Sequence, residues 1–171
     1  EDKDEYIRKG YTAVSINRVS KSVLTKTDIR KRKLSDALYK IKVFEYILKI
    51  RRHFLKRLKP SPVILDYTDY YKQLITEQDY ESDVIPQIVP QWDHSPRSGI
   101  YGLTWINTTP SLFYNHACMA LDAVKEKKNP IIILKSWNEW GEGNYMEPDT
   151  KFGHGFINAL KKAIDDKSFD K

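Results

Sequence analysis

The chain has 171 residues, a formal net charge of +6, 40% hydrophobic residues and 30% charged residues. This length is enough for one domain with its own core, and no run of about 20 apolar residues could span a membrane as a helix. The single cysteine, Cys118, excludes an internal disulfide framework. The four histidines lack the short spacing of metal ligands. We therefore expect a globular domain that holds no metal and no cofactor.

The first predicted elements are a strand and a long basic helix. Residues 1–10 are charged and are expected to fray, whereas the alternating run at 11–16 predicts a strand that ends at Asn17 and Arg18. These two polar residues are either candidates for an active face or part of an ordinary loop. Residues 27–58 then have apolar positions at helical spacing, with Lys and Arg on the opposite face.

The positive charge of the chain is concentrated in this basic helix. Residues 26–59 contain thirteen Lys or Arg and three acidic residues, so the rest of the chain is net negative. The simplest interpretation is a solvated helix face. A second is that the segment 30–59 contacts an anionic membrane surface that presents a lipid-linked glycan acceptor. Nucleic acid is not expected as a partner, because no nucleic-acid-binding motif accompanies the charge.

The middle of the chain predicts two further strands and a polar loop. A short apolar strand at 63–65 precedes a helix within 69–75. The next strand, at 84–89, contains Pro86, which indicates a bulge or a strand that starts later. The loop that follows brings together an indole, a carboxylate and a guanidinium, those of Trp92, Asp93 and Arg97. An ion pair between this carboxylate and this guanidinium would either staple the loop or help to form a site.

The last third of the chain predicts helix, strand and helix. Thr109 as N-cap and Pro110 as first helical residue start a helix that closes in a lysine-rich turn, and on it Cys118 is expected to be a small buried hydrophobic residue. The four apolar residues 131–134 predict a fully buried strand. A final amphipathic helix is predicted over 152–164, with a solvated tail after it. This alternation of strands and helices indicates an α/β fold with a parallel sheet.

The stretch 136–149 directly follows the last predicted strand and is rich in aromatic and acidic side chains. Indole rings can stack on the C–H faces of sugars, and paired carboxylates exchange protons with glycosidic oxygens. α/β folds place such chemistry at the carboxyl ends of their strands. The alternative is a glycine-containing turn with solvated glutamates and two anchoring tryptophans. The candidate residues in this stretch are Trp137, Asn138, Glu139, Trp140, Glu142, Asn144 and Glu147.

SWNEWGEGNYMEPDTKFG, residues 136–153, resembles the signature of the WbsX-like proteins, a bacterial family related to glycoside hydrolase family 99. IVPQWDHSPR at 88–97 supports this resemblance, which covers residues 11–165. It implies a (β/α)8 barrel. Because a full barrel needs about 250 residues, we expect residues 1–171 to be a single α/β domain that forms the C-terminal part of such a barrel. A half barrel exposes sheet edges, so we expect a homo-oligomer or contact with a missing N-terminal half.

The same resemblance implies roles for the two neighbouring glutamates. In family 99 the motif reads Asn-Glu-Trp-His-Glu-Gly, which makes Glu139 the base that acts on the sugar 2-hydroxyl and Glu142 the acid/base at the leaving oxygen. The sequence departs from the pattern at Gly141, where family 99 has histidine, and at His94, where the WbsX-like pattern has asparagine. The residues expected to bind substrate are Trp92, Asp93, Arg97, Trp137, Asn138, Trp140, Asn144 and Glu147.

The resemblance leaves three functions open. The first is a glycosyltransferase in the biosynthesis of lipopolysaccharide or other surface polysaccharides, with a glycan or sugar-nucleotide substrate and a location in the cytoplasm or at the periphery of the inner membrane. The second is a retaining endo-α-mannosidase-like hydrolase of the family 99 type, which the lack of a glycine-rich phosphate-binding loop favours. The third is a non-catalytic glycan-binding domain.

Overall fold

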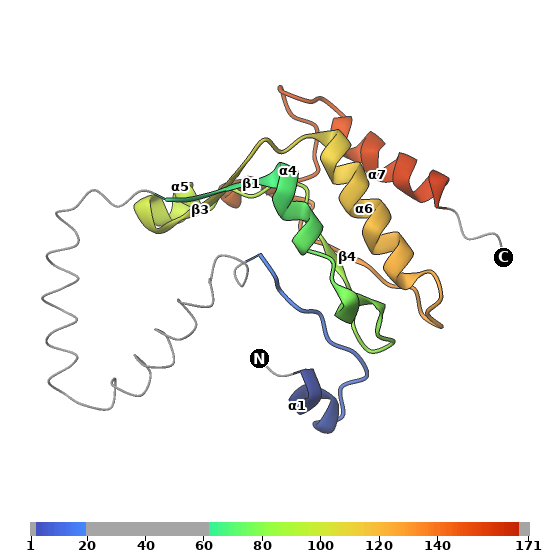
Figure 1. The fold of residues 1–171 in the computed structure, drawn as a ribbon. Helices are drawn as coiled ribbons and strands as arrows, with labels where there is room; N and C mark the ends of the chain where they lie inside the picture. Colours follow the sequence, from blue (N-terminus) through green and yellow to red (C-terminus); the bar gives the residue numbers. More distant parts are fainter. Residues whose placement is uncertain (1–2, 20–61, 168–171) are drawn as a thin grey trace, which may run out of the picture.

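The computed structural model describes residues 3–19 and 62–167. The predicted helix 27–58 and the basic segment 30–59 lie outside these ranges. Figure 1 shows the course of the described chain. Its helices and strands are α1 (Lys3–Arg8), β1 (Val63–Asp66), α4 (Tyr67–Tyr70), β2 (Gln87–Ile88), α5 (Ser95–Ser98), β3 (Leu103–Ile106), α6 (Pro110–Val124), β4 (Ile133–Leu134), β5 (Asn138–Glu139), β6 (Asn144–Tyr145) and α7 (Gly155–Asp166). Four short 3-10 helices are also present: η1 (Tyr71–Gln73), η2 (Glu77–Tyr80), η3 (Gly99–Tyr101) and η4 (Trp140–Glu142).

Three parallel strand segments lie next to one another in sequence order. The first is reduced to a single bridge between Val14 and Val84, and β2, which continues the central segment, pairs in parallel with β4. Pro86 lies between the bridge and β2 and uses only its carbonyl, which accepts a hydrogen bond from Ile133 at 3.0 Å. The prediction that this proline delays the strand is confirmed, because β2 starts at Gln87. The structure is mixed α/β with parallel strand pairs, as predicted.

The remaining parallel pair joins β1 to β3, a strand that sequence analysis did not predict. Val63 lies opposite Leu103 and Asp66 lies opposite Ile106. The predicted strand at 63–65 therefore exists, but it does not pair with the other predicted strands. The described strands form three separate two-stranded sheets, β1–β3, β2–β4 and the antiparallel β5–β6. Within residues 3–19 and 62–167 they do not close into a barrel.

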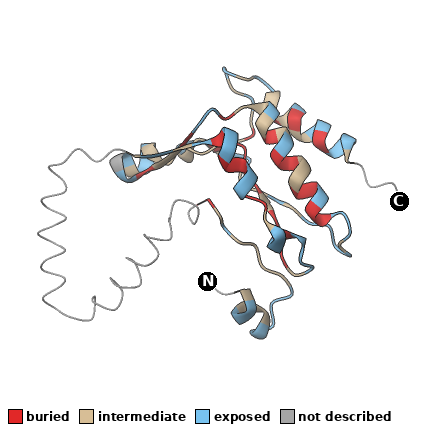
Figure 2. Cartoon of the chain, viewed as in Figure 1, coloured by how far each residue is buried: buried red, intermediate tan, exposed pale blue. Residues whose placement is uncertain are grey.

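A layer of two helices covers one face of β2 and β4. α6 and α7 lie side by side (Figure 1), and Figure 2 shows their buried residues on the sides that pack inward. The rings of Phe113 and Phe156 meet edge to face with centroids 5.7 Å apart. The core that these helices build with Ile88 of β2 includes Phe113, Ala117, Ala120, Leu121, Phe156, Ala159 and Ala163.

The start of α6 follows the predicted capping chemistry. The side chain of Thr109 accepts a hydrogen bond from the Leu112 amide at 3.3 Å, and Pro110 is the first helical residue. Cys118 is only half-buried and packs against the edge of the core. It therefore behaves as a hydrophobic residue, as predicted, although it is not fully enclosed.

The strand β4 is less buried than its apolar sequence predicts. Ile131 is 53% exposed and Ile133 is 38% exposed, whereas Ile132 and Leu134 pack against the α6–α7 core. The prediction of a fully buried strand is wrong for the described residues, because α6 and α7 cover only one of its faces. The alternation of exposed and packed positions is that of a strand with one free face.

Two other predicted helices are present with shifted boundaries. The helix expected within 69–75 is α4 followed by η1. The last helix, α7, starts at Gly155 and continues to Asp166, two residues beyond the predicted end. Most of the tail that was predicted to be solvated, residues 168–171, lies outside the described residues. No helix in residues 3–19 and 62–167 has the length and apolar character needed to cross a lipid bilayer.

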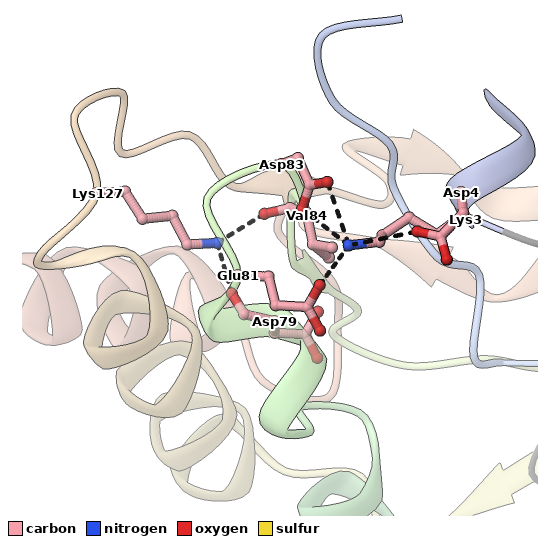
Figure 3. Close-up of polar contacts among 7 residues, drawn as sticks. All are labelled: Lys3, Asp4, Asp79, Glu81, Asp83, Val84 and Lys127. Carbon is pink, nitrogen blue, oxygen red and sulfur yellow. Dashed lines mark hydrogen bonds and ion pairs between the residues drawn. The ribbon is translucent and has the colours of Figure 1, made fainter. Parts of the chain in front are cut away.

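At the amino ends of the parallel strands, two lysines hold separate segments together (Figure 3). The ammonium group of Lys3 lies 3.1 Å from the carboxylate of Asp83. The ammonium group of Lys127 donates to the carbonyls of Asp79 at 2.5 Å and Val84 at 2.6 Å. The expectation of fraying is wrong for residues 3–10, because α1 forms there and Lys3 anchors it to the chain before β2; residues 1 and 2 lie outside the described residues.

Arg18, a sequence candidate for the active face, has a structural partner instead. Its Nη1 donates to the fully buried carboxylate of Asp79 at 2.8 Å, and that carboxylate also accepts from the Thr76 amide at 2.8 Å. The side chain of Asn17 accepts from the Val19 amide at 3.1 Å. Both residues therefore shape the chain that leads away from the first strand segment, which is the ordinary-loop alternative.

Candidate active site

Two loops that follow neighbouring strands meet at the carboxyl ends of β2 and β4. The amide of Asp93, in the loop after β2, donates to the carbonyl of Glu142, in the stretch after β4, at 2.7 Å. Gly143 makes this approach possible. Its φ is +53°, and a Cβ atom there would lie 2.9 Å from the Cβ of Asp93, so the position requires glycine both for its backbone conformation and for space.

The carboxylate of Asp93 organises the first loop from within. Its Oδ1 accepts from the Ser95 amide at 2.9 Å, from the Ser95 hydroxyl at 2.5 Å and from the Thr104 hydroxyl at 2.7 Å. Burial raises the pKa of Asp93, but these hydrogen bonds outweigh it and lower the pKa below its usual value. The carboxylate staples the loop, as one alternative predicted, but its partners are Ser95 and Thr104 and not Arg97.

Arg97 instead joins the two glutamates of the second stretch. Its Nη2 donates to Glu139 Oε1 at 2.8 Å and its Nη1 donates to Glu142 Oε1 at 3.0 Å. A Cβ atom at Gly141 would lie 3.2 Å from Glu139 Oε1 and 3.3 Å from Arg97 Nη2. The absence of a side chain at residue 141 thus lets the guanidinium lie between the two carboxylates. The predicted catalytic pair is brought together by a residue that was predicted to bind substrate.

His94 is a site residue that sequence analysis treated only as a departure from a family pattern. Its Nε2 lies 3.6 Å from Glu142 Oε1, the same oxygen that accepts from Arg97. Its Nδ1 lies 3.0 Å from the Ser98 hydroxyl. The sequence carried one weak signal for this contact: His94 directly follows Asp93, which was predicted to be a site residue.

The stretch that carries the two glutamates also carries exposed aromatic side chains. The rings of Trp140 and Tyr145 stack with centroids 3.6 Å apart and planes 15° apart. The indole Nε1 of Trp140 donates to Glu147 at 2.6 Å, which fixes the orientation of the ring. Trp137 is 50% exposed and Trp140 is 48% exposed. Exposed and oriented indole faces of this kind suit the apolar faces of a sugar ring.

The other predicted site residues lie at different depths. Asn138 is exposed on β5. Asn144 is fully buried, and its Oδ1 accepts from the Ser136 amide at 2.9 Å. The structure therefore does not bring Asn144 to a surface where substrate could touch it, and its side chain shapes the loop. The ring of Trp92 is half-buried, and the ammonium group of Lys135 lies 4.7 Å from its centroid.

Comparison with known proteins identifies the family. The family model described as "Glycosyltransferase WbsX" matches residues 3–160. The chain belongs to the WbsX glycosyltransferase family. Two curated relatives, both described as "Uncharacterized protein WxcX", come from Xanthomonas campestris pv. campestris: one, from strain ATCC 33913, is 22% identical over 104 residues, and the other, from strain B100, is 26% identical over 82 residues.

These alignments cover 59% and 46% of this chain but only 15% and 12% of the relatives' own length. The chain thus spans about a seventh of the curated relatives that it matches. No solved structure matches it. The family agrees with the one that the stretch 136–153 resembles.

For this WbsX family chain, the geometry offers two carboxylates, one guanidinium, one imidazole and an exposed aromatic surface. Carboxylates at such short range can divide the tasks of base and acid at a glycosidic centre. Among residues 3–19 and 62–167, no three His, Cys, Asp or Glu side chains are grouped so that they could hold a metal ion. The residues that the structure brings together at the two carboxylates are Asp93, His94, Arg97, Glu139, Gly141 and Glu142.

Proposed function

We propose that this chain carries the catalytic face of a glycosyltransferase that acts in the biosynthesis of lipopolysaccharide or another surface polysaccharide. The observation that carries the proposal is the pair Glu139 and Glu142 held on the guanidinium of Arg97. The rings of Trp137 and Trp140, which are exposed in the same stretch of the chain, would hold the sugar. Membership of the WbsX glycosyltransferase family points to the same class of carbohydrate chemistry.

In this proposal Glu139 acts as the base and Glu142 as the acid/base at the leaving oxygen. Arg97 contacts both carboxylates and sets their spacing. Glu147 fixes the indole of Trp140 and thus orients the sugar-binding surface. Both glutamates are reachable from solvent, with side chains 40% and 17% exposed, as a pair that must contact a glycan requires.

We further propose that residues 1–171 are a single α/β domain within the C-terminal part of a (β/α)8 barrel. The support is the order of the strand segments at Val14, β2 and β4, which are parallel and adjacent in the order of the sequence, as consecutive strands of a barrel are. β1 and β3 would then belong to two insertions, one before and one after β2 in the sequence, that pair with each other. The candidate site lies at the carboxyl ends of β2 and β4, where barrel enzymes place their chemistry.

A hydrolase of the family 99 type is the second candidate function. The favouring observation is that the carboxylate pair is complete within the described residues and needs no phosphate-binding loop to act on a glycosidic bond. A hydrolase would use water as the acceptor, whereas a transferase would use the hydroxyl of a growing glycan. The residues would be the same in both cases.

The test uses the full-length protein. It is incubated with sugar nucleotides plus glycan acceptors, and separately with α-linked oligosaccharides in water, and the products are weighed by mass spectrometry. Elongated glycans that appear only with a donor support the transferase. Shortened glycans without a donor establish the hydrolase and refute the transferase. Glycan binding without turnover in either assay would refute both enzymes and leave a glycan-binding domain.

We also propose that the basic segment 30–59 places this activity at the cytoplasmic surface of the inner membrane, where a lipid-linked acceptor is presented. The support is its charge, thirteen Lys or Arg against three acids in residues 26–59. Co-sedimentation with phosphatidylcholine vesicles, with and without phosphatidylglycerol, tests it. Binding that requires the anionic lipid and is lost at high salt is expected; equal binding to both vesicles would refute it.

A further inference from the structure

The imidazole nearest to the proposed acid/base belongs to the loop after β2. We infer that His94 is the positioning residue that exchanges a proton with Glu142 during glycosyl transfer or hydrolysis. This inference rests on the proposed function and adds a residue to its machinery. It starts from the distance of 3.6 Å between His94 Nε2 and Glu142 Oε1.

The contacts of His94 hold its ring in place for this role. Ser98, one turn further along α5, lies 3.0 Å from Nδ1 through its hydroxyl, and the ring of Trp92 lies beside it with a centroid distance of 6.3 Å. The Ser98 hydroxyl also lies 3.5 Å from Nε2, the nitrogen that lies 3.6 Å from Glu142 Oε1. The separation of 3.6 Å is an ion-pair distance, and a small rotation of the glutamate would turn it into a hydrogen bond.

The two oxygens of Glu142 differ in their partners. Nη1 of Arg97 and Nε2 of His94 both approach Oε1, and no contact to Oε2 is found among residues 3–19 and 62–167. In the proposed step Oε2 is the oxygen that serves the glycosidic oxygen. When Glu142 gives a proton to the substrate, Nε2 of His94 can replace that proton.

The charges of Arg97, Glu139 and Glu142 do not balance. Arg97 supplies one positive charge for the two carboxylates of Glu139 and Glu142, so a protonated His94 would make the four groups neutral as a set. Asp93 is a further carboxylate that interacts electrostatically with His94, while its Oδ1 accepts from Ser95 and Thr104. Two other charged side chains nearby have different partners: Lys135 lies over the ring of Trp92, and Glu147 accepts from Trp140.

The proposed step conserves protons. The imidazolium of His94 gives its Nε2 proton to Glu142, and Glu142 gives a proton to the leaving oxygen as the bond from that oxygen to the anomeric carbon breaks. In the same step Glu139 takes the proton of the sugar 2-hydroxyl, and the 2-oxygen bonds to the anomeric carbon. The hydroxyl of water or of the acceptor then forms the new bond to the anomeric carbon and loses its proton to Glu142, while the bond to the 2-oxygen breaks and Glu139 returns its proton to that oxygen. The proton on Glu142 returns to His94, so the three residues end as they began and the only net change is in the substrate.

The space around Gly141 explains why the imidazole comes from residue 94. A Cβ atom at Gly141 would lie within 3.4 Å of Arg97 and Glu139, so a histidine side chain at residue 141 would require the guanidinium to move. With Arg97 between the carboxylates, the loop after β2 is the element that can bring an imidazole to Glu142. In this chain, glycine at residue 141 thus leaves space for Arg97, and the imidazole near Glu142 is that of residue 94.

Two variants of the full-length protein separate proton exchange from hydrogen bonding. His94→Gln keeps an N–H group near the place of Nε2 but cannot carry a proton, and His94→Ala leaves a space that free imidazole can enter. With the substrate that the mass-spectrometric assay identifies, we expect both to lower kcat by about 10²-fold or more. We expect imidazole to restore His94→Ala in proportion to its concentration. His154→Ala, which removes an exposed histidine outside the site, is the matched control and should keep wild-type kcat.

A double-mutant comparison tests whether His94 acts through Glu142. In the background of Glu142→Gln, the change His94→Ala should cost no further activity, because its partner is already gone. Full activity of His94→Gln, or a loss in His94→Ala that imidazole does not reverse, would overturn the inference while leaving the proposed function intact. A wild-type protein without turnover in any assay would refute the proposed function and this inference with it.

Discussion

The buried histidine of α6 predicts that acid weakens the packing of this helix. His116 is fully buried, and its Nδ1 lies 3.0 Å from the hydroxyl of Tyr67, which donates to the Val89 carbonyl at 3.0 Å. Burial lowers the pKa of His116 from 6.5 to about 4, against the opposite effect of the carbonyls of Gln87 and Val89. A charged imidazole is therefore disfavoured in the folded chain.

The direction of the pH dependence follows from linkage. The unfolded chain binds a proton at His116 near pH 6.5, and the folded chain binds it only near pH 4. Stability is therefore full above pH 6.5 and falls as the pH drops towards 4. The shift corresponds to about 3.4 kcal/mol when the loss is complete, and to about 2 kcal/mol at pH 5.

Hydrogen–deuterium exchange of the full-length protein measures this loss locally, in peptides that cover α6. After correction for intrinsic exchange, protection in the wild type should fall between pH 7 and pH 5 by about twentyfold more than in His116→Gln. His154→Gln, which replaces an exposed histidine, should behave as the wild type. An equal fall in the wild type and in His116→Gln would refute the reasoning, because the acid sensitivity would then come from other groups.

Three further predictions concern the loops and the core. Gly143→Ala should lower the free energy of unfolding by about 1–3 kcal/mol more than Gly153→Ala in thermal denaturation, because both glycines have φ near +53° but only the first lies against Asp93; equal losses would refute the close contact. In chemical denaturation, Asp79→Asn should lower the free energy of unfolding by about 3 kcal/mol or more, and Asp122→Asn, at an exposed residue, by less than about 1 kcal/mol. Of these two residues only Asp79 forms a buried ion pair. A similar loss of stability in both variants would contradict the burial of Asp79. Trp140→Ala should weaken glycan binding in calorimetry by about tenfold and Trp140→Phe by less, and unchanged binding would exclude the indole as a sugar platform.

The elements that could be predicted from the sequence depend on local chemistry. Thr109 and Pro110 fix the start of α6 through contacts within one turn, and Pro86 delays β2 because it lacks an N–H group. β3 was missed because its partner is β1, and the register pairs Val63 with Leu103 across about forty residues. Parallel pairing at such a distance leaves no signal in a local pattern.

The sequence pointed to residues of the candidate site but not to the contacts between them. The density of Trp and Glu in residues 136–149 located the second loop, but the partners of Arg97 are Glu139 and Glu142, more than forty positions away. The sequence suggested a local pair with Asp93 instead. Asn144 was expected to bind substrate, yet its side chain is buried and its Oδ1 accepts from the Ser136 amide.

The most direct test of the account is the turnover of two glutamine variants of the full-length protein. With the substrate found by mass spectrometry, kcat/KM is measured for Glu139→Gln, Glu142→Gln and the matched control Glu126→Gln, which changes an exposed residue after α6. We predict a loss of about 10²-fold or more for each of the first two, wild-type activity for the control, and unchanged thermal unfolding for all three. Wild-type activity in either Glu139→Gln or Glu142→Gln would contradict the claim that this pair carries the chemistry.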